Sequence, residues 1–380
     1  GAIDVSRLPD LAPPALSPGW VASHLRWRAE ALRHAGRFDE AKEAAQKARK
    51  TFLSAGDVRN EGHCLRLLGH IASEQGDPNE GRKLVARALA VFDRVEDEQG
   101  RAQCEVVIGE LDYLIGDHVS ARDELHRGAR RFKAIGDPLG RAQCLLLIGL
   151  IELAEGLLPK SRDLLLEARN EFDAMGYRLG ISQCDVALAH VEHRAGDLEG
   201  ARQRALTTRD TLRALENPRG TAGAERLLAM IAVDQEDGPD AKKHGRAALD
   251  LYEKLGDPWG ILESRLLLVQ ESLLRGAIAE ASLEMRACDG IEIDEAEPLQ
   301  HRHLTRAWLA AFKKDWKEAA AAIGDAQKVF PDRRRMGDHA QQLIARFDSQ
   351  RWKDPAGAKV REWCESLGGM RGTGQFPQVH

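Results

Sequence analysis

The 380-residue chain has few aromatic residues, only 5% of the total, although 43% of its residues are hydrophobic. An apolar fraction dominated by alanine and leucine favours closely packed helices over a β-sandwich. No segment approaches 18 consecutive apolar residues, and no signal peptide begins the sequence. We therefore expect a cytoplasmic protein that is not inserted in a membrane.

The chain also lacks an excess of basic residues and closely spaced cysteine pairs. Its net charge is −5, whereas nucleic-acid binding needs a basic face, so we expect no nucleic-acid partner. Six cysteines without paired short spacings indicate a reducing compartment. The sequence opens with Gly-Ala and no initiator methionine. We interpret it as a piece of a longer protein, and whether an effector domain precedes residue 1 stays open.

The common catalytic and phosphate-binding motifs are absent. The sequence contains no Gly-x-x-x-x-Gly-Lys-Ser/Thr, His-Glu-x-x-His, Gly-x-Ser-x-Gly or Cys-x-x-Cys. We predict that the chain is not an enzyme, with no catalytic residues and no cofactor. His190 and His193, at i and i+3 of one helix, can present two imidazoles to one metal. Because no third ligand accompanies them, we predict no metal site.

What the sequence does contain is a repeat of 40 residues. One column consists of Gly36, Gly76, Gly116, Gly156, Gly196 and Gly276, and a second of Gly100, Gly140, Gly180, Gly220 and Gly260. The same step separates Cys64, Cys104, Cys144 and Cys184. Such a period is typical of one supersecondary unit repeated in tandem, so we predict a solenoid. The cysteines fall on different repeats, too far apart for one zinc ion, and we interpret them as packing residues.

The repeat divides the chain into four parts. Residues 1–18, with four prolines, are expected to form a linker. Residues 19–332 are expected to form the solenoid, with repeats at 21–60, 61–100, 101–140, 141–180, 181–220, 221–260, 261–300 and 301 to about 332. Residues 333–367 read as C-terminal capping helices, and 368–380 as a flexible tail.

Each repeat has the signals of two helices joined by a short turn, which predicts an all-α fold. Apolar residues at helical spacing precede the first glycine, where a left-handed C-cap is needed, and Asp77 follows as an N-cap. Small residues such as Gly69 and Gly81 are expected where the two helices cross. The aromatic residues Phe52, Phe92, Phe132, Phe172 and Tyr252 are expected to fill the space between repeats.

This arrangement resembles the tetratricopeptide repeat. The resemblance rests on a small residue at the eighth position, a Gly-Asp turn, and alanine at the twentieth and twenty-seventh positions. The junction from Gly136 to Ala142 is similar to the 40-residue repeats of spindle-orientation adaptors and of sensor arrays in bacterial regulators and kinases. The resemblance covers residues 20 to about 330. It implies a right-handed α-solenoid of about eight helix-turn-helix repeats that acts in protein–protein interaction or signalling.

In the tetratricopeptide-repeat family, the first helix of each repeat lines a concave face. Carried onto this chain, the corresponding positions form a largely apolar stripe through repeats three to six, which we predict to bind a partner peptide or helix. The alternative is that superhelical curvature buries this stripe in the core. The predicted partner-binding residues are Val106, Glu110, Tyr113, Leu146, Leu150, Leu153, Val186, His190, His193 and Met230.

Three functions stay open at this point. The first is a protein-interaction scaffold that binds its partner in the groove of repeats three to six. The second is a ligand- or peptide-sensing regulatory domain of a larger protein, such as a kinase or a transcription regulator. The third is a homo-oligomerisation module, for which a concentration-dependent mass would be the evidence.

Overall fold

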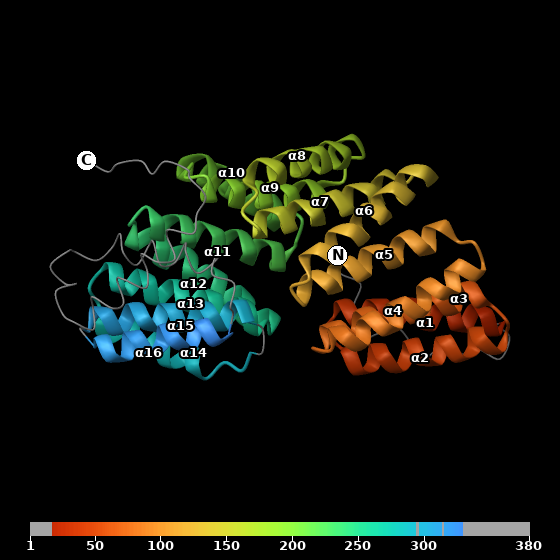
Figure 1. Cartoon of the computed structure of the whole chain (residues 1–380), viewed down its shortest axis with the longest axis horizontal. Helices are drawn as coiled ribbons and strands as arrows, with labels where there is room; N and C mark the ends of the chain where they lie inside the picture. The colour runs from red at the N-terminus through yellow and green to blue at the C-terminus, as the bar shows by residue number, and fades with distance from the viewer. Residues whose placement is uncertain (1–16, 294–295, 314, 330–380) are drawn as a thin grey trace. The chain divides into compact units, whose positions relative to one another are not determined.

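The computed structural model describes residues 17–293, 296–313 and 315–329, and over these ranges the chain forms helices joined by short turns, without strands (Figure 1). The helices are α1 (Pro18–His34), α2 (Phe38–Ser54), α3 (Val58–Glu74), α4 (Pro78–Arg94), α5 (Glu98–Leu114), α6 (His118–Ile135), α7 (Pro138–Ala154), α8 (Leu158–Ala174), α9 (Arg178–Arg194), α10 (Leu198–Ala214), α11 (Pro218–Asp234), α12 (Gly238–Leu255), α13 (Pro258–Leu274), α14 (Ile278–Asp289), α15 (Ala296–Phe312) and α16 (Trp316–Val329). The predicted capping helices at 333–367 and the tail at 368–380 lie outside the described residues, as does most of the predicted linker. The last linker residue, Pro18, instead begins α1, because the Ser17 side chain caps this helix at the Trp20 amide.

The helices belong to two compact units, residues 1–191 and 192–380, whose boundary falls inside α9. In unit 1 each helix from α1 to α8 packs against the next, and the first helices α1, α3, α5 and α7 also contact one another in series. Unit 2 repeats this pattern from α10 to α16, with α11, α13 and α15 in series. Helix pairs that follow one another in this way confirm the predicted all-α solenoid of about eight repeats.

The turns inside the repeats have the predicted chemistry. Gly76 adopts a φ of 89°, a left-handed conformation that glycine tolerates and other residues disfavour. The Asp77 amide then donates to the Ala72 carbonyl, and the Asp77 carboxylate accepts from the Glu80 amide, each over 2.9 Å. One turn therefore ends α3 and caps α4. In three comparable turns the left-handed residue is a glutamate, namely Glu96, Glu216 and Glu236, with φ of 52°, 51° and 58°.

The glycines at helix crossings and the glycines of the second column serve different contacts. A Cβ on Gly81 would lie 2.7 Å from the Gly69 carbonyl oxygen, so α3 and α4 cross with no room for a methyl group. Four of the five glycines of the second column instead lie directly against aromatic rings, as Gly100 does against Phe92, and the fifth, Gly220, lies against Leu212. The Phe92 ring is fully buried, which confirms that the aromatic residues fill the junctions between repeats.

Buried carboxylates bonded by arginine form a further repeating feature, which the sequence analysis did not identify. Asp112 on α5 is 1% exposed and accepts from Arg82 on α4 over 2.7 Å. Forty residues later, Glu152 accepts from Arg122 over the same distance. Further pairs are Arg49–Glu61, Arg131–Glu105, Arg169–Asp185, Arg204–Glu192 and Arg213–Glu225. Because a buried carboxylate is costly without a partner, these pairs tie neighbouring helices together.

The four cysteines of the repeat are fully buried, each in its own repeat. Burial raises the pKa of each of these thiols to about 12, so they are protonated at neutral pH. A protonated, inaccessible thiol is neither a nucleophile nor a zinc ligand. Their environment is that of the packing residues expected from the sequence.

Candidate functional site

The structure leaves nine of the ten predicted partner-binding residues half-buried on the first helices of their repeats. They are Val106, Glu110 and Tyr113 on α5, Leu150 and Leu153 on α7, Val186, His190 and His193 on α9, and Met230 on α11. The tenth, Leu146, is 8% exposed and belongs to the core of unit 1. The stripe is therefore a half-buried shelf rather than a broad exposed apolar patch.

Unit 1 holds the part of this shelf that adjoins charged residues. We define the first-helix face of unit 1 by nine residues of α1, α3, α5 and α7: Glu30, Arg33, Arg66, His70, Glu74, Glu110, Tyr113, Leu150 and Leu153. In the 40-residue repeat, Glu30, His70, Glu110 and Leu150 occupy the same position of successive repeats. This position therefore holds a glutamate on α1, a histidine on α3, a glutamate on α5 and a leucine on α7.

The apolar end of the face consists of Tyr113, Leu150 and Leu153. Tyr113 packs against a core cluster that contains Leu125, and its ring lies 5.5 Å from the His118 ring in a stacked arrangement. Leu150 and Leu153 pack against the next core cluster, formed by α7, α8 and α9. The core therefore holds all three side chains in place while part of each stays accessible.

The charged end of the face lies on α1 and α3. Arg33 donates from Nη2 to Glu30 Oε1 over 2.9 Å and from Nη1 to Glu74 Oε1 over 2.7 Å, so its guanidinium ties α1 to α3. Arg66 differs from Arg33, because no hydrogen bond or ion pair engages any atom of its guanidinium in the part of the chain that the structure describes. Burial also lowers the pKa of Arg66, the direction expected for a cation that has lost water.

Glu110 lies on the helix between the charged end and the apolar end. In the part of the chain that the structure describes, no hydrogen bond or ion pair engages its half-buried carboxylate. Burial raises the pKa of Glu110 to about 7, against the attraction of Arg33 and Arg66, while Glu74 adds to the rise. Since these three residues all lie on α1 and α3, Glu110 faces across the first helices.

His70 lies on α3, at the repeat position that Glu30 occupies on α1 and Glu110 occupies on α5. Burial, followed by the charges of Arg66 and Arg33, lowers the pKa of His70 to about 3. The imidazole is therefore neutral at physiological pH and adds no charge to this face.

In unit 2 the polar residues at the corresponding positions bond to one another. His193 Nε2 lies 2.7 Å from Asp234 Oδ2, so this imidazole already has a carboxylate partner. The Arg226 guanidinium lies 4.7 Å from the centre of the Trp259 ring and donates to the sulfur of Met230. Further contacts are Glu263–His301 and Gln270–His301. Arg226 and Gln270, the residues of unit 2 that correspond to Arg66 and Glu110, thus each have a bonding partner, although Arg226 Nε itself has none among the described residues.

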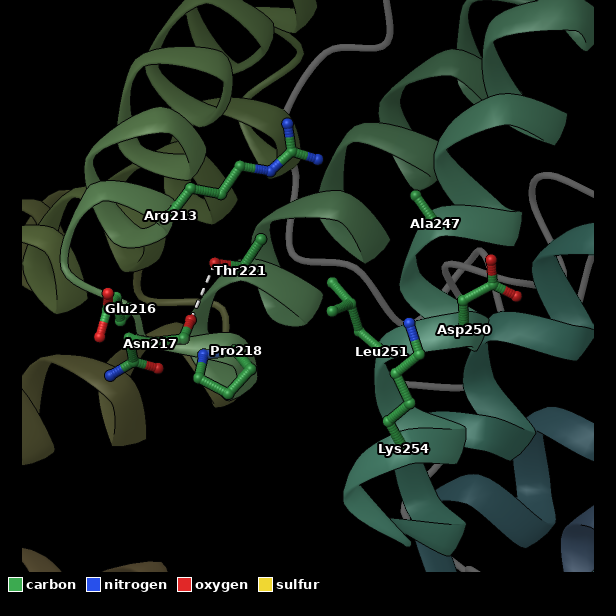
Figure 2. Close-up of a pocket in the computed structure, with 9 residues that line it drawn as sticks. All are labelled: Arg213, Glu216, Asn217, Pro218, Thr221, Ala247, Asp250, Leu251 and Lys254. Atoms are coloured by element: carbon green, nitrogen blue, oxygen red, sulfur yellow. Dashed lines mark hydrogen bonds between the residues drawn. The ribbon is translucent and has the colours of Figure 1, made fainter. Parts of the chain in front are cut away.

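A hollow of about 480 Å³ lies in unit 2 among α10, α11 and α12 (Figure 2). Figure 2 shows Arg213 and Thr221 on one side and Leu251 and Lys254 on the other. The polar groups of the first side are already engaged, because Thr221 donates to the Asn217 carbonyl over 2.8 Å and Arg213 binds a buried glutamate. This hollow lies between second helices and is separate from the predicted face.

The described ranges also bear on metal binding and on membrane insertion. No group of three or more histidine, cysteine, aspartate or glutamate side chains in them is arranged to hold a metal ion. Nor does any helix in these ranges combine the length and the apolar character needed to cross a membrane.

The sequence analysis identified Glu110 and the apolar residues but not the charged residues beside them. Arg33, Arg66 and Glu74 were missed because the groove was placed in repeats three to six, and these residues lie in the first two repeats. A signal was available, because residues of both signs occupy the first helices of the first two repeats, Glu30 and Arg33 in one and Arg66 and Glu74 in the other. Opposite charges on adjacent helices predict ion pairs between them.

Comparison with known proteins agrees with this architecture. Residues 20–93 match the family model of the tetratricopeptide repeat, while no curated protein sequence matches the chain. A Rap protein complexed with Competence and Sporulation Factor is similar with a TM-score of 0.68 and 12% identity, over 93% of this chain and 98% of that one. The Rap conjugation gene regulator of plasmid pLS20, in complex with the Phr* peptide, gives 0.63 and 13%, over 87% and 99%. The apo quorum sensor NprR from B. thuringiensis gives 0.56 and 12%, over 88% and 99%. At these identities the likeness concerns the fold.

Proposed function

Because this chain is a tetratricopeptide-repeat protein, we propose that it binds a peptide along the first-helix face of unit 1 and acts as a peptide-responsive scaffold in the cytoplasm. The similar Rap and pLS20 regulators were solved with a bound factor and a bound peptide, and the similar NprR is a quorum sensor. These likenesses support the class of ligand. The place of binding is argued from the side chains of this chain alone.

The observation that carries the proposal is the contrast between the two units. Unit 1 keeps two half-buried charged side chains, Glu110 and Arg66, that make no hydrogen bond among the described residues, whereas the corresponding Gln270 and Arg226 of unit 2 are bonded to His301 and Met230. Beside them lies the apolar shelf of Tyr113, Leu150 and Leu153. A buried polar group without a partner costs folding free energy, whereas a ligand that supplies the partner recovers it. A peptide offers both polar groups and apolar side chains at regular spacing.

The dimensions of the face suit a short extended peptide. Neighbouring first helices contact one another, and packed helices lie ~8–10 Å apart, so α1 to α7 cover roughly 25–30 Å. An extended chain rises by about 3.3–3.6 Å per residue, so about eight residues span this distance. We therefore take an octapeptide as the probe length.

The test is affinity selection from a library of random octapeptides, with bound peptides identified by mass spectrometry. Three proteins are compared: the wild type, Leu150→Arg and Leu166→Arg. Leu166 is a matched control, because it lies in the same repeat on the second helix α8 and is 41% exposed. We expect the wild type and Leu166→Arg to select the same peptides and Leu150→Arg to select none of them, with similar helicity and melting temperature in all three.

Two results would count against this function. One is a wild type that retains no peptide, and the other is a folded Leu150→Arg variant that selects the wild-type set. If peptides bind as expected, small-angle scattering with and without the selected peptide separates a sensor from a static scaffold. A sensor changes its overall dimensions on binding, and a static scaffold does not.

A further inference from the structure

The first helices of later repeats each bury one side against the second helix that precedes them. On α5 this side consists of Cys104, Val107 and Leu111, which form a core cluster with residues of α4. On α3, Leu67 and Ile71 pack in the same way against α2. All five side chains are at most 3% exposed. Because α1 is the first described helix, the corresponding side of α1 has no described second helix before it.

That side of α1 carries two tryptophans. At the positions that α3 and α5 bury, α1 holds His24, Trp27 and Ala31, and Trp20 lies one turn before His24 on the same side. We define the end stripe of α1 by these four residues. Trp20 is 47% exposed and Trp27 is 63% exposed. A large indole that is exposed at a position used for packing in other repeats indicates an interface rather than an ordinary solvated position.

The end stripe offers apolar surface rather than charge. None of its four residues is acidic, and none is a lysine or an arginine. Two arginines flank Trp27, and both are engaged within unit 1. The Arg26 guanidinium lies 4.7 Å from the centre of the Trp27 ring, and Arg28 interacts electrostatically with Glu40 of α2. Since an anionic lipid surface or a nucleic acid would need free cations, we infer that the stripe pairs with another apolar surface.

Trp20 excludes a further repeat of the same kind as that surface. It occupies the repeat position of Gly100 and Gly140, where an aromatic ring of the preceding second helix leaves no space for a side chain. A Cβ on Gly100 would already lie 2.4 Å from the Phe92 ring. An indole at this position therefore blocks the packing by which one repeat follows another, which a head-to-tail array of copies would reuse.

We propose that two copies of the chain associate through their end stripes, with the two α1 helices antiparallel about a two-fold axis. Trp20 and Trp27 lie two turns apart on one side of α1, about 10 Å along the helix. Antiparallel pairing places Trp20 of each copy against Trp27 of the other, which makes the surface complementary to itself. Arg26 then lies opposite Val21, so the arginines of the two copies do not face each other. This dimer does not depend on the peptide-binding function.

The size of this contact predicts a weak dimer. A tryptophan side chain buries about 150–250 Å² when it is fully covered. With 47% and 63% of Trp20 and Trp27 still to be covered in each copy, the four indoles would bury roughly 330–550 Å². A specific interface needs about 1,000 Å² in total, so the indoles supply about a third to a half of it and the rest of α1 supplies the remainder. We therefore expect a dissociation constant of roughly 1–100 μM.

The first experiment measures the mass of the full chain by sedimentation equilibrium, from about 1 to about 300 μM. Three proteins are compared: the wild type, Trp27→Gln and Leu114→Gln. Leu114 is a matched control, because it also lies on a first helix of unit 1 and is 65% exposed. We expect the wild type and Leu114→Gln to pass from monomer to dimer with the same dissociation constant, and Trp27→Gln to associate at least about tenfold more weakly. Circular dichroism should show the same helicity and melting temperature in all three.

The second experiment tests the antiparallel arrangement. A cysteine is placed on α1 by Ser23→Cys or by His34→Cys, in a chain that also carries Cys364→Ser, because the other five cysteines are buried. Ser23 lies beside the expected two-fold axis, so two copies of Ser23→Cys should form a disulfide on oxidation. His34 is the last residue of α1, and its two copies would lie about 30 Å apart, beyond the reach of a disulfide. His34→Cys should therefore stay unlinked.

Each other outcome overturns the proposed dimer. A wild type that stays monomeric at the highest concentration has no such interface. If the fluorescence that Trp27→Phe removes is then shielded from acrylamide, the chain's own residues cover the stripe instead. An equal dissociation constant for the wild type and Trp27→Gln would place the dimer interface elsewhere, and masses above a dimer would indicate a head-to-tail array. Equal disulfide formation by Ser23→Cys and His34→Cys would refute the antiparallel pairing.

Discussion

The substitution Glu110→Gln should stabilise the folded protein, and the gain should depend on pH. Burial raises the pKa of Glu110 from its ordinary value of 4.5 to about 7. Below pH 4.5 the carboxyl group is protonated in both the folded and the unfolded chain, so its charge has no effect on stability. Between pH 4.5 and pH 7 the unfolded chain has released a proton that the folded chain retains, so the wild type loses stability as the pH rises. Above pH 7 the loss is complete and constant.

The size of the effect follows from the two pKa values. Each pH unit between them costs about 1.4 kcal/mol, so the wild type loses at most about 3 kcal/mol relative to Glu110→Gln by pH 8. Glutamine keeps the shape and hydrogen-bonding capacity of the side chain but cannot ionise. The assay is urea unfolding of both proteins at pH 5, 6, 7 and 8, with Glu43→Gln as the control, because the Glu43 side chain is 66% exposed. A difference that does not change with pH, or a wild type that is the more stable at pH 8, would show that Glu110 is ionised and well paired in the fold.

Three further predictions concern the fold. Glu236→Gly should stabilise the protein by about 1 kcal/mol in thermal unfolding, because Glu236 occupies a left-handed conformation with a φ of 58°; a loss of stability would contradict the turn assignment. Gly69→Ala should destabilise the protein by about 1–3 kcal/mol, because its Cβ would lie 2.9 Å from the Gly81 carbonyl oxygen. Gly223→Ala, whose Cβ would lie 3.8 Å from its nearest neighbour, should be neutral or stabilising by up to about 1 kcal/mol. Equal effects of the two substitutions in urea unfolding would refute the close crossing of α3 and α4. Arg82→Ala should destabilise the protein by about 2 kcal/mol or more, because it leaves the buried carboxylate of Asp112 without a cation. Lys83→Ala, at the exposed neighbouring position, should not destabilise it. Matching unfolding midpoints for the two variants would show that the Arg82–Asp112 pair contributes nothing to stability.

The repeating part of the fold could be predicted from the sequence because each signal is local and occurs many times. A left-handed glycine, an aspartate cap and a small residue at a crossing each follow from the backbone of a few neighbouring residues, as at Gly76, Asp77 and Gly81. The period then places the same features in every other repeat. Elements near the ends of the solenoid carry fewer repeats of each signal, and the predicted capping helices remain a prediction.

The burial of individual face residues could not be predicted in the same way. Leu146 and Leu150 are four residues apart on α7 and both apolar, yet the first belongs to the core and the second remains half-buried. The difference depends on how far each first helix is rotated against its neighbours, which no local signal fixes. The arginine–carboxylate pairs were missed for a related reason. Arg82 and Asp112 are 30 residues apart, and each alone reads as an ordinary exposed charge.

Positions that keep their residue type along the solenoid serve packing, whereas the variable positions on the first helices are those that we expect to contact a ligand. The glycine, aspartate and aromatic columns repeat because the same backbone contact recurs in each repeat, and a change there would break one helix pair. The column of Glu30, His70, Glu110, Leu150, His190, Met230 and Gln270 lies on the same side of every first helix, yet no two adjacent members are alike. Packing does not require this variation, since the first six of these side chains are only half-buried. The seventh, Gln270, is bonded to His301. A surface that reads one particular peptide does require it, because each helix then meets a different part of the ligand. Exchanging Glu110 for the leucine of the next repeat should therefore leave the fold intact and change the set of octapeptides that the protein selects. Exchanging Gly109 for leucine should disrupt the helix pair, because a Cβ there would already lie 2.7 Å from Leu125.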